Sequence, residues 1–159
     1  MRIAVVSDSH GDMRWVNKIR GTLDSVDCVI HLGDYVGDAR KLSDMLKCLV
    51  YYVAGNGDIM SSAPQVLEQS IGGVKIMAVH GHRHRVNDDL YSLAADAQSR
   101  DAKICLYGHT HIPDITNYYG IWFINPGSVS RARGMSKESY AIININKNGE
   151  VIPDIMCID

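Results

Sequence analysis

The chain opens with the stretch Ile3-Ala4-Val5-Val6-Ser7-Asp8-Ser9-His10, in which a short apolar run rich in β-branched residues ends directly in polar residues. The same arrangement returns in residues 28–34 (CVIHLGD) and in residues 50–56 (VYYVAGN). Short runs that are apolar throughout are typical of strands buried on both faces of a sheet. The sequence therefore predicts parallel strands joined by right-handed crossovers, with helices covering the sheet.

Apolar residues at helical spacing separate these strands and continue further along the chain. One expected helix carries Met13, Val16, Ile19 and Leu23; a second follows a cap at Asp38 and carries Leu42, Met45, Leu46 and Leu49; a third is capped by Asn87 or Asp88 and carries Leu90, Leu93, Ala94 and Ala97. Further strands are expected at residues 74–79, 103–107, 121–124, 140–145 and 151–156, with a hairpin turn at Asn148-Gly149. We expect an α/β fold in which two sheets pack as layers with helices outside, forming a single domain over residues 1–159.

Composition restricts the classes of partner and compartment. The 16 basic and 18 acidic side chains nearly cancel, so no strong nucleic-acid binding and no membrane binding are expected from the summed charge, although a local basic patch stays open. Cys28, Cys48, Cys105 and Cys157 show no C-x-x-C spacing, and we interpret them as core cysteines in a reducing cytoplasm, with a disulfide framework as the alternative. We expect no signal peptide, because the first apolar run meets Asp8 at once, and no stretch long enough to span a bilayer.

Potential metal ligands follow the expected strands, at the edge where ligand sites form in parallel α/β sheets. They are Asp8 and His10, Asp34, Asn56, His80, and His109 with His111. Carboxylate, imidazole and amide donors without a thiolate suit Mn²⁺, which we favour, or Ni²⁺, Fe²⁺, Co²⁺ or Zn²⁺. Because seven ligands exceed what one tetrahedral ion needs, the set favours two divalent metal ions that share a carboxylate and a hydroxide.

This ordered set resembles the signature of the calcineurin-like metallophosphoesterase superfamily, which runs D-x-H, G-D, G-N-x, H and G-H-x-H. The resemblance covers nearly the whole chain. The compact length and the loop Asn125-Pro126-Gly127-Ser128 make it similar to the small bacterial and archaeal phosphodiesterase branch. The resemblance implies a four-layer α-β-β-α sandwich of two mixed sheets flanked by helices.

Carried over residue by residue, the resemblance places Asp8, His10 and His111 on the first metal and Asn56, His80 and His109 on the second. It places Asp34 between the two metals. One departure concerns Gly57, because larger members of the superfamily carry a histidine there that is thought to help the leaving group. General-acid assistance is therefore in doubt in this chain.

The remaining candidates surround this set. His82 is expected to contact the substrate phosphate or to orient a neighbour, and Arg131 to steady a phosphate, so that Asp34, Asn56 and His82 form the catalytic group. His31 is expected to be a core or supporting histidine, His84 to be solvated, and Asp58 to serve as a turn or cap residue that deserves testing as a proton donor.

We expect hydrolysis of a small phosphodiester by a hydroxide that bridges the two metals. A diester is favoured over a monoester because it brings less charge to neutralise and the site lacks an evident general acid. A phosphomonoesterase and a noncatalytic protein-interaction scaffold of the same fold stay as alternatives, and a homo-oligomer stays open.

Overall fold

The computed structural model describes all residues from Met1 to Asp159 and contains two five-stranded mixed sheets. The first sheet has the order β10-β9-β1-β2-β3, and the second has the order β4-β5-β6-β8-β7. The strands of the first sheet are β1 (Arg2–Val6), β2 (Cys28–His31), β3 (Leu49–Tyr52), β9 (Ser139–Ile145) and β10 (Val151–Cys157). Those of the second are β4 (Val66–Ile71), β5 (Val74–Val79), β6 (Ile104–Leu106), β7 (Pro113–Tyr118) and β8 (Ile121–Pro126).

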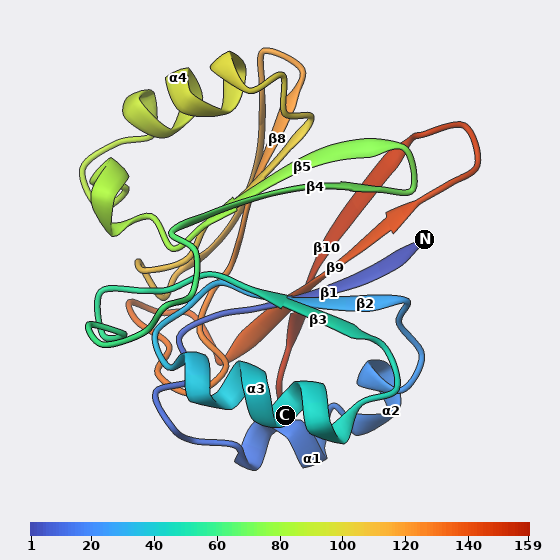
Figure 1. Cartoon of the computed structure of the whole chain (residues 1–159), viewed down its shortest axis with the longest axis vertical. Helices are drawn as coiled ribbons and strands as arrows, with labels where there is room; N and C mark the ends of the chain where they lie inside the picture. Colours follow the sequence, from blue (N-terminus) through green and yellow to red (C-terminus); the bar gives the residue numbers. More distant parts are fainter.

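Helices cover the outer face of each sheet, so the molecule has four layers (Figure 1). The helices α1 (Arg14–Lys18), α2 (Arg20–Leu23) and α3 (Val36–Met45) lie outside the first sheet, and α4 (Tyr91–Ser99) lies outside the second, after the short 3₁₀ helix η1 (His82–His84). This arrangement confirms the expected α-β-β-α sandwich. No helix has the length and hydrophobicity that crossing a membrane would require.

Alternation along the strands explains the layers. In β1, Ile3 and Val5 pack between the two sheets, whereas Ala4 and Val6 pack against the helical layer, and all four are fully buried. In β5 the same alternation directs Ile76 toward the central core and Met77 toward α4. Both faces of the central strands are therefore covered, which accounts for their continuous apolar sequence.

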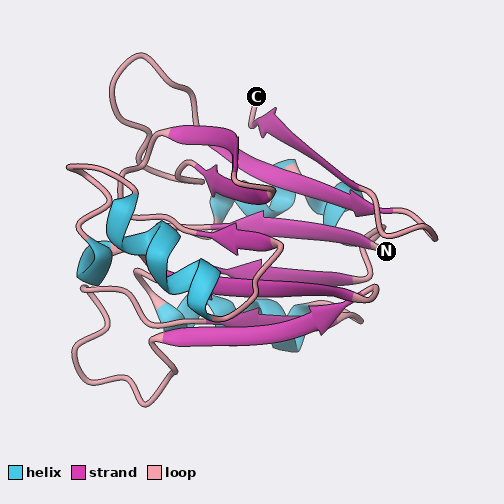
Figure 2. Ribbon diagram, turned by 90° about the horizontal axis from the view of Figure 1, so that it is seen from above, coloured by secondary structure: helices cyan, strands magenta, loops and turns pink.

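The parallel strands end at one edge of the sandwich and the hairpins turn at the other. β1, β2 and β3 are mutually parallel, as are β5, β6 and β8. The longer loops gather at the end of the sandwich away from the N-terminus, as Figure 2 shows. We call that end the metal edge and the opposite end, where the β4–β5, β7–β8 and β9–β10 hairpins turn, the hairpin edge.

Several local expectations were wrong. The first helix is divided at Ile19 into α1 and α2, and Leu49 lies on β3 with its side chain exposed rather than on the second helix. Asp38 lies inside the first turn of α3, and α4 begins after Leu90, where Asp89 rather than Asn87 or Asp88 accepts a hydrogen bond from the Tyr91 amide. The edge strands β4 and β7 were not predicted, because their partly exposed, polar sequences lack the apolar run used to identify the others.

All four cysteines are free, but only Cys28 and Cys105 belong to the core. Cys48 is half-buried and Cys157 is exposed near the end of β10, so the expectation of core positions was wrong for Cys157. The hairpin at Asn148-Gly149 is present, with Gly149 at a φ of 78°.

Candidate metal centre

The structure brings the seven expected ligands together at the metal edge. Each lies just after a parallel strand: Asp8 and His10 after β1, Asp34 after β2, Asn56 after β3, His80 after β5, and His109 and His111 after β6. Because these strands end at the same edge, loops separated by up to about a hundred residues meet there, as the contact between His10 and His111 illustrates.

One group of donor atoms is formed by Asp8, His10 and His111. The Nε2 atom of His111 lies 3.2 Å from Oδ1 of Asp8 and 3.3 Å from Nε2 of His10. Asp34 approaches this group with its Oδ2 atom, which lies 3.9 Å from Nε2 of His10. These spacings allow Asp8, His10 and His111 to hold one metal ion.

A second group is centred on His80. Its Nε2 atom lies 3.1 Å from Oδ1 of Asn56, 3.3 Å from Nδ1 of His109 and 3.5 Å from Oδ1 of Asp34. Asp34 therefore turns one carboxylate oxygen toward each group. Asp8 also lies within reach, because its Oδ1 is 3.9 Å from Nε2 of His80, so Asp8, Asp34 and His80 form a second set that could hold an ion.

The hydrogen-bonding roles of these side chains leave several lone pairs facing one another. The Nδ1 atoms of His80 and His111 donate to the carbonyl oxygens of Leu32 and Arg131, at 2.8 and 2.6 Å, so the Nε2 atoms of the neutral rings carry lone pairs. Oδ2 of Asp8 accepts from Ser7 and from the His109 amide, whereas its buried Oδ1 atom has no hydrogen-bond partner. Acceptors converging in a buried space fit a bound cation, because a cation would satisfy several of them together.

Burial and neighbouring charge shift the pKa values of these groups. Burial raises the pKa of Asp8, but its contacts with His111, His80 and Ser7 outweigh burial and hold the pKa below the usual range. Burial lowers the pKa of His10 and of His109, so both rings favour the neutral form that a metal needs. Burial also lowers the pKa of His111, but the Asp8 carboxylate more than compensates and raises it.

The backbone at the metal edge is strained. Asp8, His10, Asp34, His109 and His111 have positive φ angles of 56°, 48°, 53°, 69° and 61°. Left-handed backbone costs a residue with a side chain roughly 1–2 kcal/mol. Such outliers persist where the surrounding structure imposes them and are concentrated at functional sites.

Two carboxylates, buried Asp38 and half-buried Asp58, hold the strained loops in place, which for Asp58 agrees with the expected turn or cap role. Asp58 accepts hydrogen bonds from the amides of Tyr35, Val36 and Gly55, which joins the loop after β3 to the first turn of α3. Its oxygens are thus occupied, which argues for the structural interpretation of Asp58. Asp38 accepts from the Ser9 hydroxyl and the Gly11 amide, at 2.8 and 2.9 Å, and fixes the loop that carries His10.

His31 supports the same loops and is not a ligand. It is fully buried, its Nδ1 atom accepts from the Gly33 amide at 3.1 Å, and its Nε2 atom contacts the Ser9 hydroxyl at 3.1 Å. Burial lowers its pKa from 6.5 to about 4. His84 was expected to be solvated, but its ring lies 3.0 Å from the Asp96 carboxylate of α4 and is only 15% exposed.

His82 and Arg131 lie beside the ligand groups. The ring of His82 is 5.4 Å from that of His80 and 6.2 Å from that of His109, and its buried Nδ1 atom has no partner. The exposed Arg131 side chain lies close enough to His10 for its charge to lower the pKa of that ring. The Arg131 carbonyl, which supports His111, is a contact that sequence reasoning missed.

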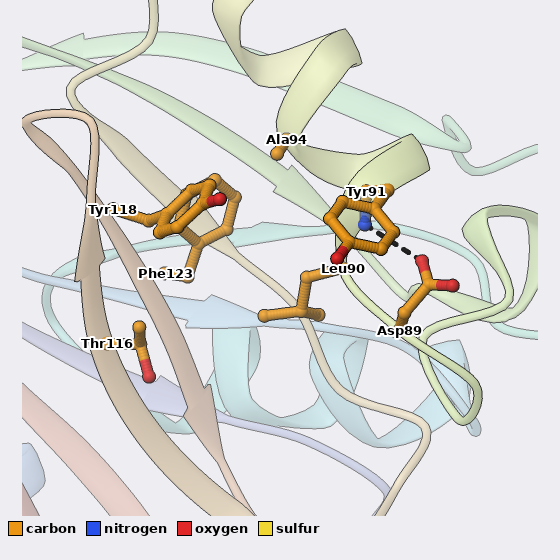
Figure 3. A pocket seen from close by; sticks show the side chains of 7 residues that line it. All are labelled: Asp89, Leu90, Tyr91, Ala94, Thr116, Tyr118 and Phe123. Carbon is orange, nitrogen blue, oxygen red and sulfur yellow. Dashed lines mark hydrogen bonds between the residues drawn. The ribbon is translucent and has the colours of Figure 1, made fainter.

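Two surface hollows are lined by residues of the centre or by their direct neighbours in sequence. One, of about 480 Å³, includes Gly57 and Asp58 with Arg40 on its wall; the other, of about 590 Å³, includes His10 and Gly11. A third hollow, of about 290 Å³, lies between α4 and β7 and contains none of the ligand residues (Figure 3). Its lining is mainly apolar, with Leu90, Tyr118 and Phe123. No positively charged side chain lines it, so it lacks the chemistry needed to bind a phosphate.

Comparisons with known proteins agree with this geometry. Residues 1–148 match the family described as the calcineurin-like phosphoesterase superfamily domain. A Bacillus subtilis protein named "Probable metallophosphoesterase YsnB" is 30% identical over 155 residues, which cover 96% of this chain and 89% of the relative.

Two solved structures are similar along almost the whole chain. A predicted phosphoesterase from Streptococcus pneumoniae is 33% identical, with a TM-score of 0.79 and coverage of 98% of this chain and 96% of the other. A variant of Vps29 from Entamoeba histolytica is 25% identical, with a TM-score of 0.76 and coverage of 98% of both chains. The converging ligand loops, the four-layer fold and these similarities together show that the chain belongs to the calcineurin-like metallophosphoesterase superfamily.

Proposed function

We propose that the chain is a phosphodiesterase that uses two divalent metal ions, with Mn²⁺ as the first choice and Ni²⁺, Fe²⁺, Co²⁺ or Zn²⁺ as alternatives. The observation that carries the proposal is the position of Asp34, whose Oδ2 atom faces His10 at 3.9 Å while its Oδ1 atom faces His80 at 3.5 Å. One carboxylate between two groups of lone pairs is suited to join two ions.

Each ion has its own set of ligands in this proposal. Asp8, His10 and His111 hold the first, whereas Asn56, His80 and His109 hold the second. The carbonyls of Leu32 and Arg131 accept from the Nδ1 atoms of His80 and His111, which leaves the Nε2 atoms of both rings available as the atoms that would bind the metals. The Gly57 amide donates to Oδ1 of Asp34 at 2.8 Å and holds the shared carboxylate in orientation.

The bound ions would supply Lewis-acid stabilisation of the phosphate and a water activated to hydroxide near neutral pH. The chain positions the phosphate for attack and limits the water around it. The ring of His82 lies beside the rings of His80 and His109, where it would hydrogen-bond a phosphate oxygen. Burial and the neighbouring histidines lower the pKa of His82, so it serves as a neutral donor or acceptor rather than as a fixed charge.

A phosphodiester fits the surroundings better than a monoester. The hollow lined by Gly57 and the hollow lined by His10 give room near the ligand groups for the two ester groups of a diester. No side chain stands at position 57 to protonate a leaving group, which favours the less charged diester and a good leaving group. A phosphomonoesterase stays as the second candidate.

The noncatalytic scaffold is a weaker candidate for this chain. The fold is shared with Vps29, so the architecture alone does not decide between catalysis and protein binding. The complete ligand set and the backbone strain at five of its members favour an enzyme, since a scaffold has no need for them.

The wider setting is also proposed. A single domain over residues 1–159 is supported by the central core, to which both sheets contribute. A cytoplasmic location is supported by four free cysteines. We propose a small phosphoester as the partner and leave a homo-oligomer open.

Hydrolysis of bis(p-nitrophenyl) phosphate and of p-nitrophenyl phosphate by the Mn²⁺-loaded chain tests the function. The diester should turn over faster, and Asp34→Asn should lower kcat/KM for both esters by about 10³-fold. Asp89→Asn, which changes a carboxylate in the remote hollow of Figure 3, is the matched control and should keep the activity. Faster turnover of the monoester would favour the second candidate, and no turnover of either ester would refute the phosphoesterase.

A further inference from the structure

The chain's nine arginines fall into two classes by the partners of their side chains. Arg14, Arg20, Arg85 and Arg100 form ion pairs with nearby carboxylates, and Arg2 donates a hydrogen bond to Ser25. The other four have exposed side chains with no ion pair and no hydrogen bond: Arg40, Arg83, Arg131 and Arg133.

All four free arginines stand around the metal edge. Arg40 lines the hollow that contains Gly57, and Arg83 directly follows His82 in η1. The Arg131 carbonyl accepts from Nδ1 of His111, and the Arg133 amide donates to the His111 carbonyl oxygen at 3.3 Å. We call these four residues the arginine rim.

Unpaired lysines do not follow this distribution. Lys103 and Lys147 lie at the hairpin edge, Lys18 ends α1, and Lys47 lies in a hollow with Asp24 and Asp27. The carboxylates near the rim already have partners, since Asp12 pairs with Arg14 and Asp58 accepts three amides. The rim therefore places uncompensated guanidinium charge at the mouth of the site although the whole chain has a net charge of −2.

We infer that the substrate is a phosphodiester that carries at least one further phosphate group, which the arginine rim binds. This inference rests on the proposed function. A simple diester brings one negative charge, and the two metals and His82 face that phosphate, so it leaves the rim without an anion. Guanidinium groups match phosphate oxygens in charge and in paired hydrogen-bond geometry, which a lysine does not provide.

Calorimetry on the full chain loaded with Mn²⁺ tests this with two probes, thymidine 3′,5′-bisphosphate and thymidine 5′-monophosphate. Each probe has one phosphate for the metals, so the ratio of the two dissociation constants reports the second phosphate. We expect the bisphosphate to bind at least about tenfold more tightly in low salt, with the preference shrinking as salt screens the rim.

The variants Arg40→Ala and Arg133→Ala should each reduce the preference by about threefold to fivefold, the size expected for an exposed ion pair. Arg85→Ala and Arg20→Ala are matched controls, because both arginines are exposed but already paired with Asp88 and Asp24. Equal binding of the two probes, or an equal loss of preference in Arg85→Ala, would overturn the inference. Because the readout is binding, a chain that hydrolyses no phosphoester would refute the proposed function without deciding this test.

Discussion

The two ends of the sandwich differ in which residues adopt the left-handed backbone conformation of their turns and loops. At the hairpin edge, the positive φ angles of the turns fall largely on glycines, at Gly72, Gly73, Gly120 and Gly149. At the metal edge, comparable angles fall on glycines such as Gly11, Gly33 and Gly81, but also on three histidines and two aspartates. Glycine adopts this conformation without strain, whereas an imidazole or carboxylate residue does not.

The difference shows where the chain loses stability in order to place potential metal-binding side chains. A glycine at His10 or Asp34 would relax the backbone, but it would remove a donor atom. The same edge leaves Oδ1 of Asp8 and Nδ1 of His82 buried without partners, which is a second kind of cost. Strain and unsatisfied polar atoms at one place are the physical mark of a binding site, and metal binding would offset the strain and satisfy Oδ1 of Asp8.

Asp34→Asn should have the largest effect on activity. It would separate the contribution of the carboxylate charge from that of the loop conformation. Asparagine tolerates the left-handed φ of 53° and keeps an oxygen for the Gly57 amide, so the loop should hold its shape. The loss of the shared negative charge should lower kcat/KM for bis(p-nitrophenyl) phosphate by about 10³-fold. Activity within a few fold of the wild type would remove Asp34 from the bridging position.

Acid should lower the stability of the folded chain through protonation of His31, which lies at the metal edge. The folded pKa of about 4 lies below the ordinary value of 6.5, so between these values the unfolded chain binds more protons. Stability is therefore fully present above about pH 6.5 and falls as the pH drops toward 4, by roughly 3 kcal/mol.

Urea unfolding at pH 7 and pH 4.5 measures this loss, and His31→Asn supplies the comparison. Asparagine can still accept from the Gly33 amide but does not titrate, so the variant should lose less stability over the same interval. An identical loss in both proteins would show that other groups cause the acid sensitivity.

Gly57→His should change how steeply the rate of diester hydrolysis depends on the acidity of the leaving group. A general acid helps a poor leaving group by typically 10²–10⁴-fold, and we expect an unoptimised graft to recover about tenfold with alkyl diesters. Gly57 does not have a positive φ, so its backbone admits a side chain, but an added Cβ would lie 3.2 Å from Oδ1 of Asp34 and the carboxylate would have to shift by a few tenths of an ångström. Gly57→Ala is the control for the added Cβ. A shallow dependence in the native protein would mean that another residue already donates the proton, and His82 would be tested first.

The smallest expected effect is the change in stability that comes from backbone strain. His10→Gly and His10→Ala both remove the imidazole, but glycine should be more stable by about 1 kcal/mol because φ is 48° there. The same order is expected at the hairpin edge: Gly120→Ala should lose about 1 kcal/mol of stability, since φ is 75° and a Cβ would meet no other atom within 4 Å. Denaturation with the metals chelated measures both differences. An alanine variant at position 10 as stable as the glycine variant would remove strain from the account.

The sequence predicted the layers and the positions of the candidate ligands after the strands, because both depend on local patterns. The run Ile3–Val6 indicates a strand buried on both faces, and its direct passage into Asp8 indicates a loop at the sheet edge. The division of the first helix at Ile19 and the partly polar strands β4 and β7 depend on tertiary pairing, which local patterns do not encode.

Supporting contacts were the least predictable part of the site. Asp58 caps α3 from a loop more than twenty residues away, and the Arg131 carbonyl orients His111 across a similar separation. The summed charge also gave no sign of the arginine rim, because only the structure distinguishes the free arginines from those paired with carboxylates.

The central claim is that the metal edge holds two ions on one shared carboxylate, and the direct test is a Mn²⁺ titration of the metal-depleted chain, read by calorimetry and by elemental analysis of the saturated protein. The account predicts saturation at two ions per chain, together with an increase in thermal stability that His80→Ala reduces and His82→Ala leaves in place. Saturation at one ion per chain, or no binding, would contradict it.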